Sequence, residues 1–226
     1  MNWQDEGYLL NKRKFRENAN IIDIFTSNYG KMSGIVYGGN SRKIRNFLQI
    51  SNKIFAFYTA KNQNKIGYLK VELINPISPR YFNDKKRTTA LIALTSILKI
   101  LLPESQPYSN IYKSLENFLE NMNSENWISL YVIWELNLIK ELGFDPNLIQ
   151  FFDKKSDLLT FKDIIIDGIN YAAPNYLINN NLPKTYDNKF LKKSLTFTRT
   201  ILMNKFFTPN NLIFPKSRIL LENYFS

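Results

Sequence analysis

Two glycines and three cations lie close together in the segment VYGGNSRKIRNFLQ, residues 36–49. The glycines would let the backbone approach a ligand closely, and Arg42, Lys43 and Arg45 could contact successive phosphates. The segment lacks the Gly-Lys-Ser/Thr ending of a Walker A loop and the G-x-G-x-x-G pattern of a dinucleotide site. We therefore expect a basic loop that contacts a polyanion, with an ordinary solvated turn as the alternative.

Acidic residues offer the other candidate chemistry, and four of them gather in one region: Asp153, Asp157, Asp163 and Asp167. The last two would share a face if this region were helical. The spacing matches neither an EF-hand nor a two-metal centre, so we expect solvated loop acids, with a metal-dependent nuclease as an alternative. The chain has no cysteine and no histidine, which excludes thiolate chemistry and the commonest general base. We expect no cofactor, no metal and no enzymatic activity.

Positive charge is concentrated early in the chain. The net charge is +11, and residues 1–80 hold 13 Lys and Arg against 5 Asp and Glu. This asymmetry favours a polyanionic partner for the first third of the chain, unless it reflects a general surplus of surface lysine. No apolar run reaches the ~18 residues of a membrane-spanning helix, and the N-terminus does not resemble a signal peptide. We expect a cytoplasmic protein.

The period of the sequence changes near residue 80. Five short runs rich in β-branched and aromatic residues predict strands at 6–11, 20–26, 31–37, 53–59 and 65–74. Helical spacing follows, with helices predicted over 84–101, 111–122, 124–142 and 188–207 and near the end of the chain. We predict an α+β chain with a five-stranded oligonucleotide-binding (OB) barrel over 1–79 and a helical domain over 80–226, irregular at about 151–187. An SH3-like barrel would give nearly the same strand pattern.

The aromatic residues of the fourth predicted strand face both ways. Phe55 and Phe57 lie on one face and Tyr58 lies on the other. We expect burial on both sides because helices would pack on the barrel, with base stacking as the alternative.

Four segments carry a resemblance to a known family: WQDEGYLL, ENANIIDIFTSNYGKMSGIVYGGNSR, LLPESQPYSNIYKSLENFLE and WISLYVIWELNLIKELGF. In this order and spacing they resemble the bacterial DNA repair family RecO across most of the chain. The resemblance implies an OB-fold N-terminal domain and a helical C-terminal domain. It also implies a nucleoid-associated mediator of the RecF pathway that binds single- and double-stranded DNA and anneals complementary strands. Such a mediator contacts the tail of single-stranded-DNA-binding protein (SSB) and, with RecR, helps to load RecA.

The resemblance assigns DNA contacts to the glycine-rich segment. The positions concerned are Gly38, Gly39, Ser41 and Arg42 on the family's G-G-x-S-R pattern, extended by Lys43 and Arg45. A second basic cluster at the domain junction is added from its charge alone: Arg80, Lys85, Lys86 and Arg87. Many family members carry a four-cysteine zinc site after the L-G-F helix. Because no cysteine occurs here, we expect packing alone to hold residues 151–187.

A peptide site for the acidic, apolar SSB tail is predicted in the last long helix. There Lys192, Lys193 and Arg199 lie in sequence beside Leu195, Phe197 and Leu202. An RNA-binding OB accessory protein stays open as an alternative function, because the same basic barrel would serve it.

Overall fold

The computed structural model describes residues 1–226 except 40, 62–65, 152–156, 180–181 and 183–185. The chain divides into two compact units, one of Met1–Tyr112 with Pro215–Arg218 and one of Lys113–Phe214 with Ile219–Ser226. The predicted domain boundary at residue 80 stays a prediction.

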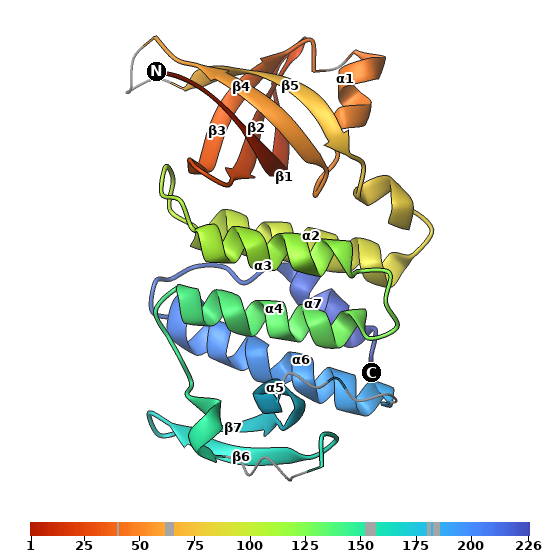
Figure 1. The fold of residues 1–226 in the computed structure, drawn as a ribbon, viewed down its shortest axis with the longest axis vertical. Coiled ribbons are helices and arrows are strands. Elements are labelled where there is room, and N and C mark those ends of the chain that lie inside the picture. Colours follow the sequence, from red (N-terminus) through yellow and green to blue (C-terminus); the bar gives the residue numbers. More distant parts are fainter. Residues whose placement is uncertain (40, 62–65, 152–156, 180–181, 183–185) are drawn as a thin grey trace. The chain divides into compact units, whose positions relative to one another are not determined.

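A closed five-stranded barrel dominates the first unit (Figure 1). Its strands are β1 (Asn2–Arg16), β2 (Ala19–Thr26), β3 (Gly30–Tyr37), β4 (Lys53–Thr59) and β5 (Gly67–Asn75). They pair in the order β1-β2-β3-β5-β4, and a short helix, α1 (Arg42–Phe47), lies between β3 and β4 in the chain. The predicted α+β class and OB-type barrel are confirmed. The first strand is longer than predicted and takes in the cations that lie between the first two predicted strands.

Alternating side chains build the barrel core. Its buried members include Leu9, Ile22, Ile24, Ile54, Ala56, Leu69 and Val71. Trp3 is stacked between Tyr29 and Tyr58, with ring centroids 4.6 and 4.9 Å away. This stack joins β1 to β4 and to the β2–β3 turn, and so holds the sheet closed from inside.

The barrel closes through a short parallel contact between β3 and β5, in which Gly34 pairs with Gly67 and Ile35 with Tyr68. Both glycines lie against large side chains. A Cβ on Gly34 would lie 2.6 Å from Leu69 Cγ, and one on Gly67 would lie 2.6 Å from Tyr58 Oη. The closure therefore depends on residues without side chains at these two positions.

Helices follow the barrel, as the change of period predicts. A 3₁₀ helix (Ser78–Tyr81) leads into α2 (Lys85–Leu101), and α3 (Ser109–Glu120) crosses from the first unit into the second. The remaining elements are α4 (Trp127–Glu141), a 3₁₀ helix (Leu148–Phe151), β6 (Phe161–Ile166), β7 (Ile169–Pro174), α5 (Tyr176–Asn179), α6 (Asn188–Leu202), a π-helix (Met203–Phe207) and α7 (Lys216–Asn223). Among the described residues, no helix is both long enough and apolar enough to cross a membrane.

The region 151–187 is more regular than predicted, because β6 and β7 form an antiparallel hairpin there. Aromatic packing holds it within the second unit. Phe190 of α6 contacts Phe161 at 5.0 Å and Tyr176 at 5.8 Å between ring centroids. Tyr171 of β7 meets the ring of Phe197 edge-on at 6.4 Å.

Replacing Gly67 with alanine is expected to lower the free energy of unfolding by about 1–3 kcal/mol, because the new methyl group overlaps the Tyr58 ring. Urea unfolding measured by circular dichroism gives this value. Glu72→Ala, an exposed change on the same strand, is the control and should stay within about 0.5 kcal/mol. A Gly67→Ala protein as stable as the parent would show that the space between Gly67 and the Tyr58 ring accommodates a methyl group.

Replacing Phe190 with alanine is expected to cost about 3–5 kcal/mol, because three aromatic neighbours would be left without their packing partner. The neighbouring exposed change Lys189→Ala is the control. Thermal and urea unfolding of the whole chain measure both. A decrease below about 1 kcal/mol for Phe190→Ala would contradict the role of aromatic packing in holding the β6–β7 hairpin.

Candidate nucleic-acid interface

The end of β1 forms a basic hairpin with the start of β2, defined here as residues 12–16. Its cations are Lys12, Arg13, Lys14 and Arg16, and all but the partly buried Lys12 are exposed. Phe15 is 42% exposed, and the Arg16 guanidinium lies 5.1 Å from its ring centroid. Irregular pairing between Leu9 and Asn11, and again between Lys14 and Arg16, redirects the side chains along this stretch.

No carboxylate forms an ion pair with Arg13, Lys14 or Arg16 in the described part of the chain. These three exposed cations therefore meet solvent without an acidic partner among the described residues. Sequence reasoning missed this site because the run lies between the first two predicted strands and was assigned to neither. The density of charge in KRKFR was the signal that could have found it.

The predicted glycine-rich loop is partly a helix. Gly38 takes a positive φ of +68°, and with the buried Gly39 it turns the chain out of β3. The Ser41 hydroxyl then accepts a hydrogen bond from the Ile44 amide at 3.4 Å and caps α1. The expectation of a loop is therefore wrong from Arg42 onward, because these residues form a helix whose Ile44 packs against the barrel core. The contact of this segment with a polyanion stays a prediction.

The predicted cations of this segment fall on α1. Arg45 is exposed. Arg42 and Lys43 lie in the helical backbone, but their side chains are outside the described residues.

Arg45 lies close enough to the basic hairpin to influence it electrostatically. Partial burial lowers the pKa of Lys12, and the positive charge of Arg45 lowers it further. Two cations from different elements are thus held near each other at an energetic cost. An anion bound between them would relieve that repulsion.

Aromatic side chains cover the outer face of β3, β5 and β4. Tyr37 and Tyr68 are stacked at 5.5 Å and are 52% and 45% exposed. On the same face Phe55 and Phe57 are half-buried and contact each other at 5.0 Å. The expectation that these phenylalanines are fully buried is wrong, whereas Tyr58 on the opposite face does belong to the core.

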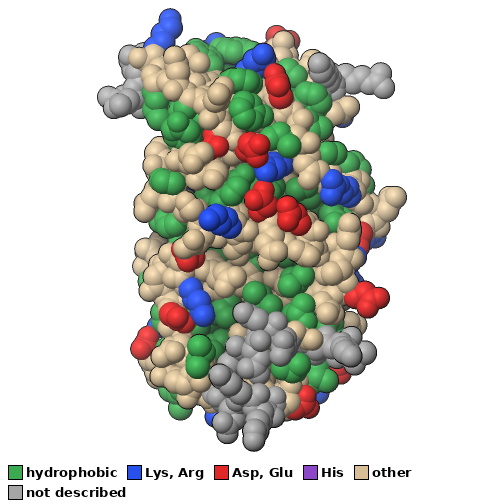
Figure 2. All heavy atoms as spheres, viewed as in Figure 1, with side chains coloured by type: hydrophobic (Ala, Val, Ile, Leu, Met, Phe, Trp, Pro, Cys, Tyr) green, Lys and Arg blue, Asp and Glu red, His purple; other side chains and the backbone are tan. Residues whose placement is uncertain are grey.

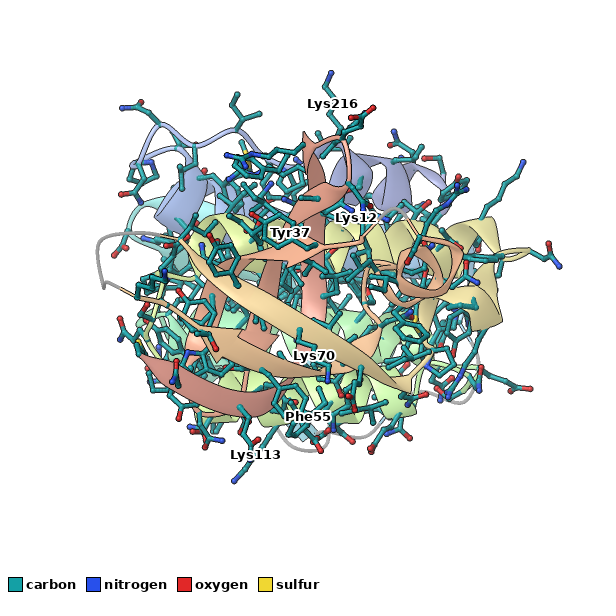
Figure 3. The ribbon with its side chains drawn as sticks, turned by 90° about the horizontal axis from the view of Figure 1, so that it is seen from above. Lys12, Tyr37, Phe55, Lys70, Lys113 and Lys216 are labelled. Carbon is teal, nitrogen blue, oxygen red and sulfur yellow. The ribbon has the colours of Figure 1, made fainter. Side chains whose placement is uncertain are left out.

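A cation and a groove complete this surface. The Lys70 ammonium lies 5.6 Å from the Phe57 ring centroid. A groove of about 970 Å³ runs between β3, β5 and α1, and Tyr37, Phe57 and Tyr68 are among its lining residues. In Figure 3, Lys12, Tyr37, Lys70 and Phe55 follow one another across the barrel. On the face of the molecule drawn in Figure 2, acidic and basic side chains are mixed among the described residues.

The junction cations are partly engaged in local structure. Burial raises the pKa of Asp84, but hydrogen bonds from the backbone and side chain of Arg87 outweigh it and lower that pKa overall. Asp84 caps α2, so Arg87 has a structural role. Arg80 donates to the side chain of Asn75. Lys85 is exposed and Lys86 is partly buried on the first turn of α2.

The apolar residues of the predicted peptide site on α6 are not accessible to a peptide. Phe197 is 2% exposed, and both leucines of the set are fully buried, so all three side chains belong to the core. They are buried because α6 packs against both α4 and β7. Arg199 forms an ion pair with Glu222 at 2.8 Å, and the Lys193 ammonium lies 4.3 Å from the Phe161 ring centroid. Lys192 is partly exposed.

The aspartates do not form a metal site in the described part of the chain. Asp163 lies on β6 rather than on a helix, and Asp167 at the following turn pairs with Lys205. Asp153 lies outside the described residues. No group of three or more potential metal ligands occurs among the residues that are described.

Comparison with known proteins fits this barrel and these helices. Residues 1–77 match the family model described as Recombination protein O N terminal, and residues 83–206 match Recombination protein O C terminal. The chain belongs to the RecO family. It is 31% identical to the DNA repair protein RecO of Wolbachia pipientis wMel, covering 98% of this chain and 99% of that protein. It is also 33% identical to the DNA repair protein RecO of Cereibacter sphaeroides strain ATCC 17029, covering 66% of this chain and 62% of that protein.

RecO membership gives the chain a general role in DNA repair and recombination. Membership of this family of recombination proteins supports the predicted non-enzymatic role. The N-terminal match ends at residue 77 and the C-terminal match begins at residue 83, close to the predicted change of period near residue 80.

Changing Arg13, Lys14 and Arg16 to alanine together is expected to weaken binding to single-stranded DNA and to flatten its salt dependence. The slope of log Kobs against log salt should fall by about 0.7 for each phosphate that the variant no longer neutralises, so by about 2. Fluorescence anisotropy over a salt series measures the slope. Arg13→Lys with Arg16→Lys keeps the charge and should leave the slope unchanged. An unaltered slope in the alanine variant would remove the basic hairpin from the interface.

Proposed function

We propose that this chain is a DNA-binding mediator of recombinational repair, which binds single- and double-stranded DNA through its barrel and anneals complementary strands. The observation that carries the proposal is a cluster of exposed cations on an OB-type barrel, formed by Arg13, Lys14 and Arg16 of the basic hairpin with Arg45 of α1. No ion pair joins these four side chains to a carboxylate among the described residues. Phosphate contacts of this kind supply affinity for any sequence, as annealing of arbitrary strands requires. Annealing needs no bond chemistry from the protein.

The proposed DNA path uses the predicted residues together with the basic hairpin. Arg42, Lys43 and Arg45 of α1 would neutralise phosphates, and the turn formed by Gly38, Gly39 and Ser41 sets the direction of that helix. Lys85 and Lys86, with Arg80 and Arg87, would extend contact to a longer or double-stranded substrate.

The proposed partners follow from the role of the family. With RecR, the chain would help to load RecA onto single-stranded DNA covered by SSB. Contact with the SSB tail would bring the chain to such DNA in the nucleoid. Lys192 and Lys193 are the predicted cations that keep some exposure for this contact, whereas the buried Phe197 would not take part directly.

Annealing of complementary strands precoated with SSB tests the proposal. The wild-type chain is expected to accelerate annealing without nucleotide or divalent metal. Changing Arg42, Lys43 and Arg45 to alanine, or the three exposed hairpin cations, should slow it by about tenfold. Lys113→Ala with Lys189→Ala removes two cations of the second unit and is the control expected to leave the rate unchanged.

The same experiment with structured RNA in place of DNA distinguishes the proposed DNA-binding function from the alternative, an RNA-binding accessory role. Equal or stronger action on RNA than on complementary DNA strands would favour an RNA accessory role. Failure to accelerate DNA annealing at any ratio of protein to SSB would contradict the proposed function. Shortened labelled strands in the presence of magnesium or manganese would instead indicate a nuclease.

A further inference from the structure

We propose that the groove between β3, β5 and α1 accepts unstacked bases of a single nucleic-acid strand, with Tyr37 and Tyr68 as the stacking residues. This inference rests on the proposed DNA binding and assigns the base-contacting part of the same surface. The basic hairpin and Arg45 would hold the phosphates of that strand.

The groove has the size and lining of a site for planar apolar groups. Its volume of about 970 Å³ lies at the upper end of the roughly 300–1,000 Å³ that small-molecule sites occupy. Buried aliphatic side chains of the barrel core line it, including Val36, Leu69 and Val71. Ile44 and Phe47 of α1 contribute further apolar surface. An apolar hollow next to a cationic surface fits a ligand that combines flat rings with negative charge.

Tyr37 and Tyr68 expose about half of their side chains although both are large aromatics. Their rings are stacked with an angle of 27° between the planes, so each supports the other in a fixed orientation. Rigid rings at the edge of a groove can stack on bases of any sequence, because every base has a π-face. Phe57 adds a half-buried ring to the same groove.

Charge favours a nucleic acid over an apolar peptide or a second copy of the chain. The groove is lined by Lys70, and Arg45 follows directly after the lining residue Ile44. Partial burial lowers the pKa of Lys12, and the charge of Arg45 lowers it further, which shows that the two cations are close. Among the described lining residues Glu72 is the acidic one, and it forms an ion pair with Lys70 at 3.8 Å between Oε1 and Nζ. The excess positive charge beside the groove therefore comes from Arg45 and the basic hairpin. A second copy would bring the same cations and be repelled, whereas a strand brings phosphates.

The geometry also separates single strands from duplex. In a duplex the faces of the bases are covered by their neighbours, so Tyr37 and Tyr68 could not stack on them without unpairing. Phosphates remain accessible in both forms. The cations would therefore bind either form, and the aromatic groove would add affinity for the single strand alone.

Anisotropy titrations with three labelled probes of equal length test this inference. The probes are oligothymidylate, the same backbone made entirely of abasic sites, and a duplex. Wild-type protein is expected to bind oligothymidylate about 5- to 150-fold more tightly than the abasic strand, the range for one stacked base. Changing both Tyr37 and Tyr68 to leucine should abolish this difference without weakening binding to the abasic strand or the duplex. Changing both to phenylalanine keeps the rings and should preserve it.

The outcomes distinguish the base-binding groove from the proposed DNA-binding function on which it rests. Equal wild-type affinity for oligothymidylate and the abasic strand would overturn the base-binding groove and leave phosphate-driven DNA binding intact. The same holds if the leucine variant keeps the full preference for bases. Absence of binding to all three probes would overturn the groove and the proposed function together. The wild-type comparison needs no variant, so it decides the matter even if the leucine protein folds poorly.

Discussion

The structure of the first unit depends on how β3 and β5 meet. Their parallel contact extends over two residue pairs, and in the first of them a glycine faces a glycine. The strands must approach closely there because Leu69 and Tyr58 fill the space that side chains would need. The segment between β3 and β4 provides α1, whose Ile44 and Phe47 line the groove together with Tyr37 and Tyr68. The tight closure and the open groove are thus formed by the same pair of strands.

Positive charge determines which kind of ligand the barrel surface beside the groove would bind. The basic hairpin and Arg45 come from β1 and α1, which are far apart in the sequence, and the barrel brings them close enough for Arg45 to lower the pKa of Lys12. Repulsion of this kind costs stability, and folded proteins tend to keep such costs at functional sites. A phosphate backbone is the ligand that would offset it. Contacts to phosphates do not involve the bases. The aromatic groove would add contacts to the bases themselves.

Much of the fold could be predicted from the sequence because its periods are plain. Alternating β-branched and aromatic residues marked all five barrel strands, and leucine spacing marked α2 and α4. The basic hairpin was missed because a run of exposed cations at the end of a strand has no apolar alternation to reveal it. The short α1 was missed because six residues contain too few turns for helical spacing to stand out, although Ser41 at its N-cap was a signal.

Burial was harder to predict than secondary structure, because it depends on neighbours from other parts of the chain. Phe197 was expected at the surface because cations lie beside it in the sequence, but α6 packs against two elements and buries it. Phe55 and Phe57 were expected to be buried because helices would pack on the barrel, but their face of the barrel stays half-exposed.

Mapping the contacts of bound DNA over the whole chain shows whether the interface is centred on the barrel. Ultraviolet cross-linking of the intact protein to oligothymidylate, followed by mass spectrometry, identifies the attached residues without presupposing a site. Cross-links are predicted at Tyr37, Tyr68 or Phe57 and in the basic hairpin. Cross-links confined to residues 113–214 would contradict a barrel-centred interface.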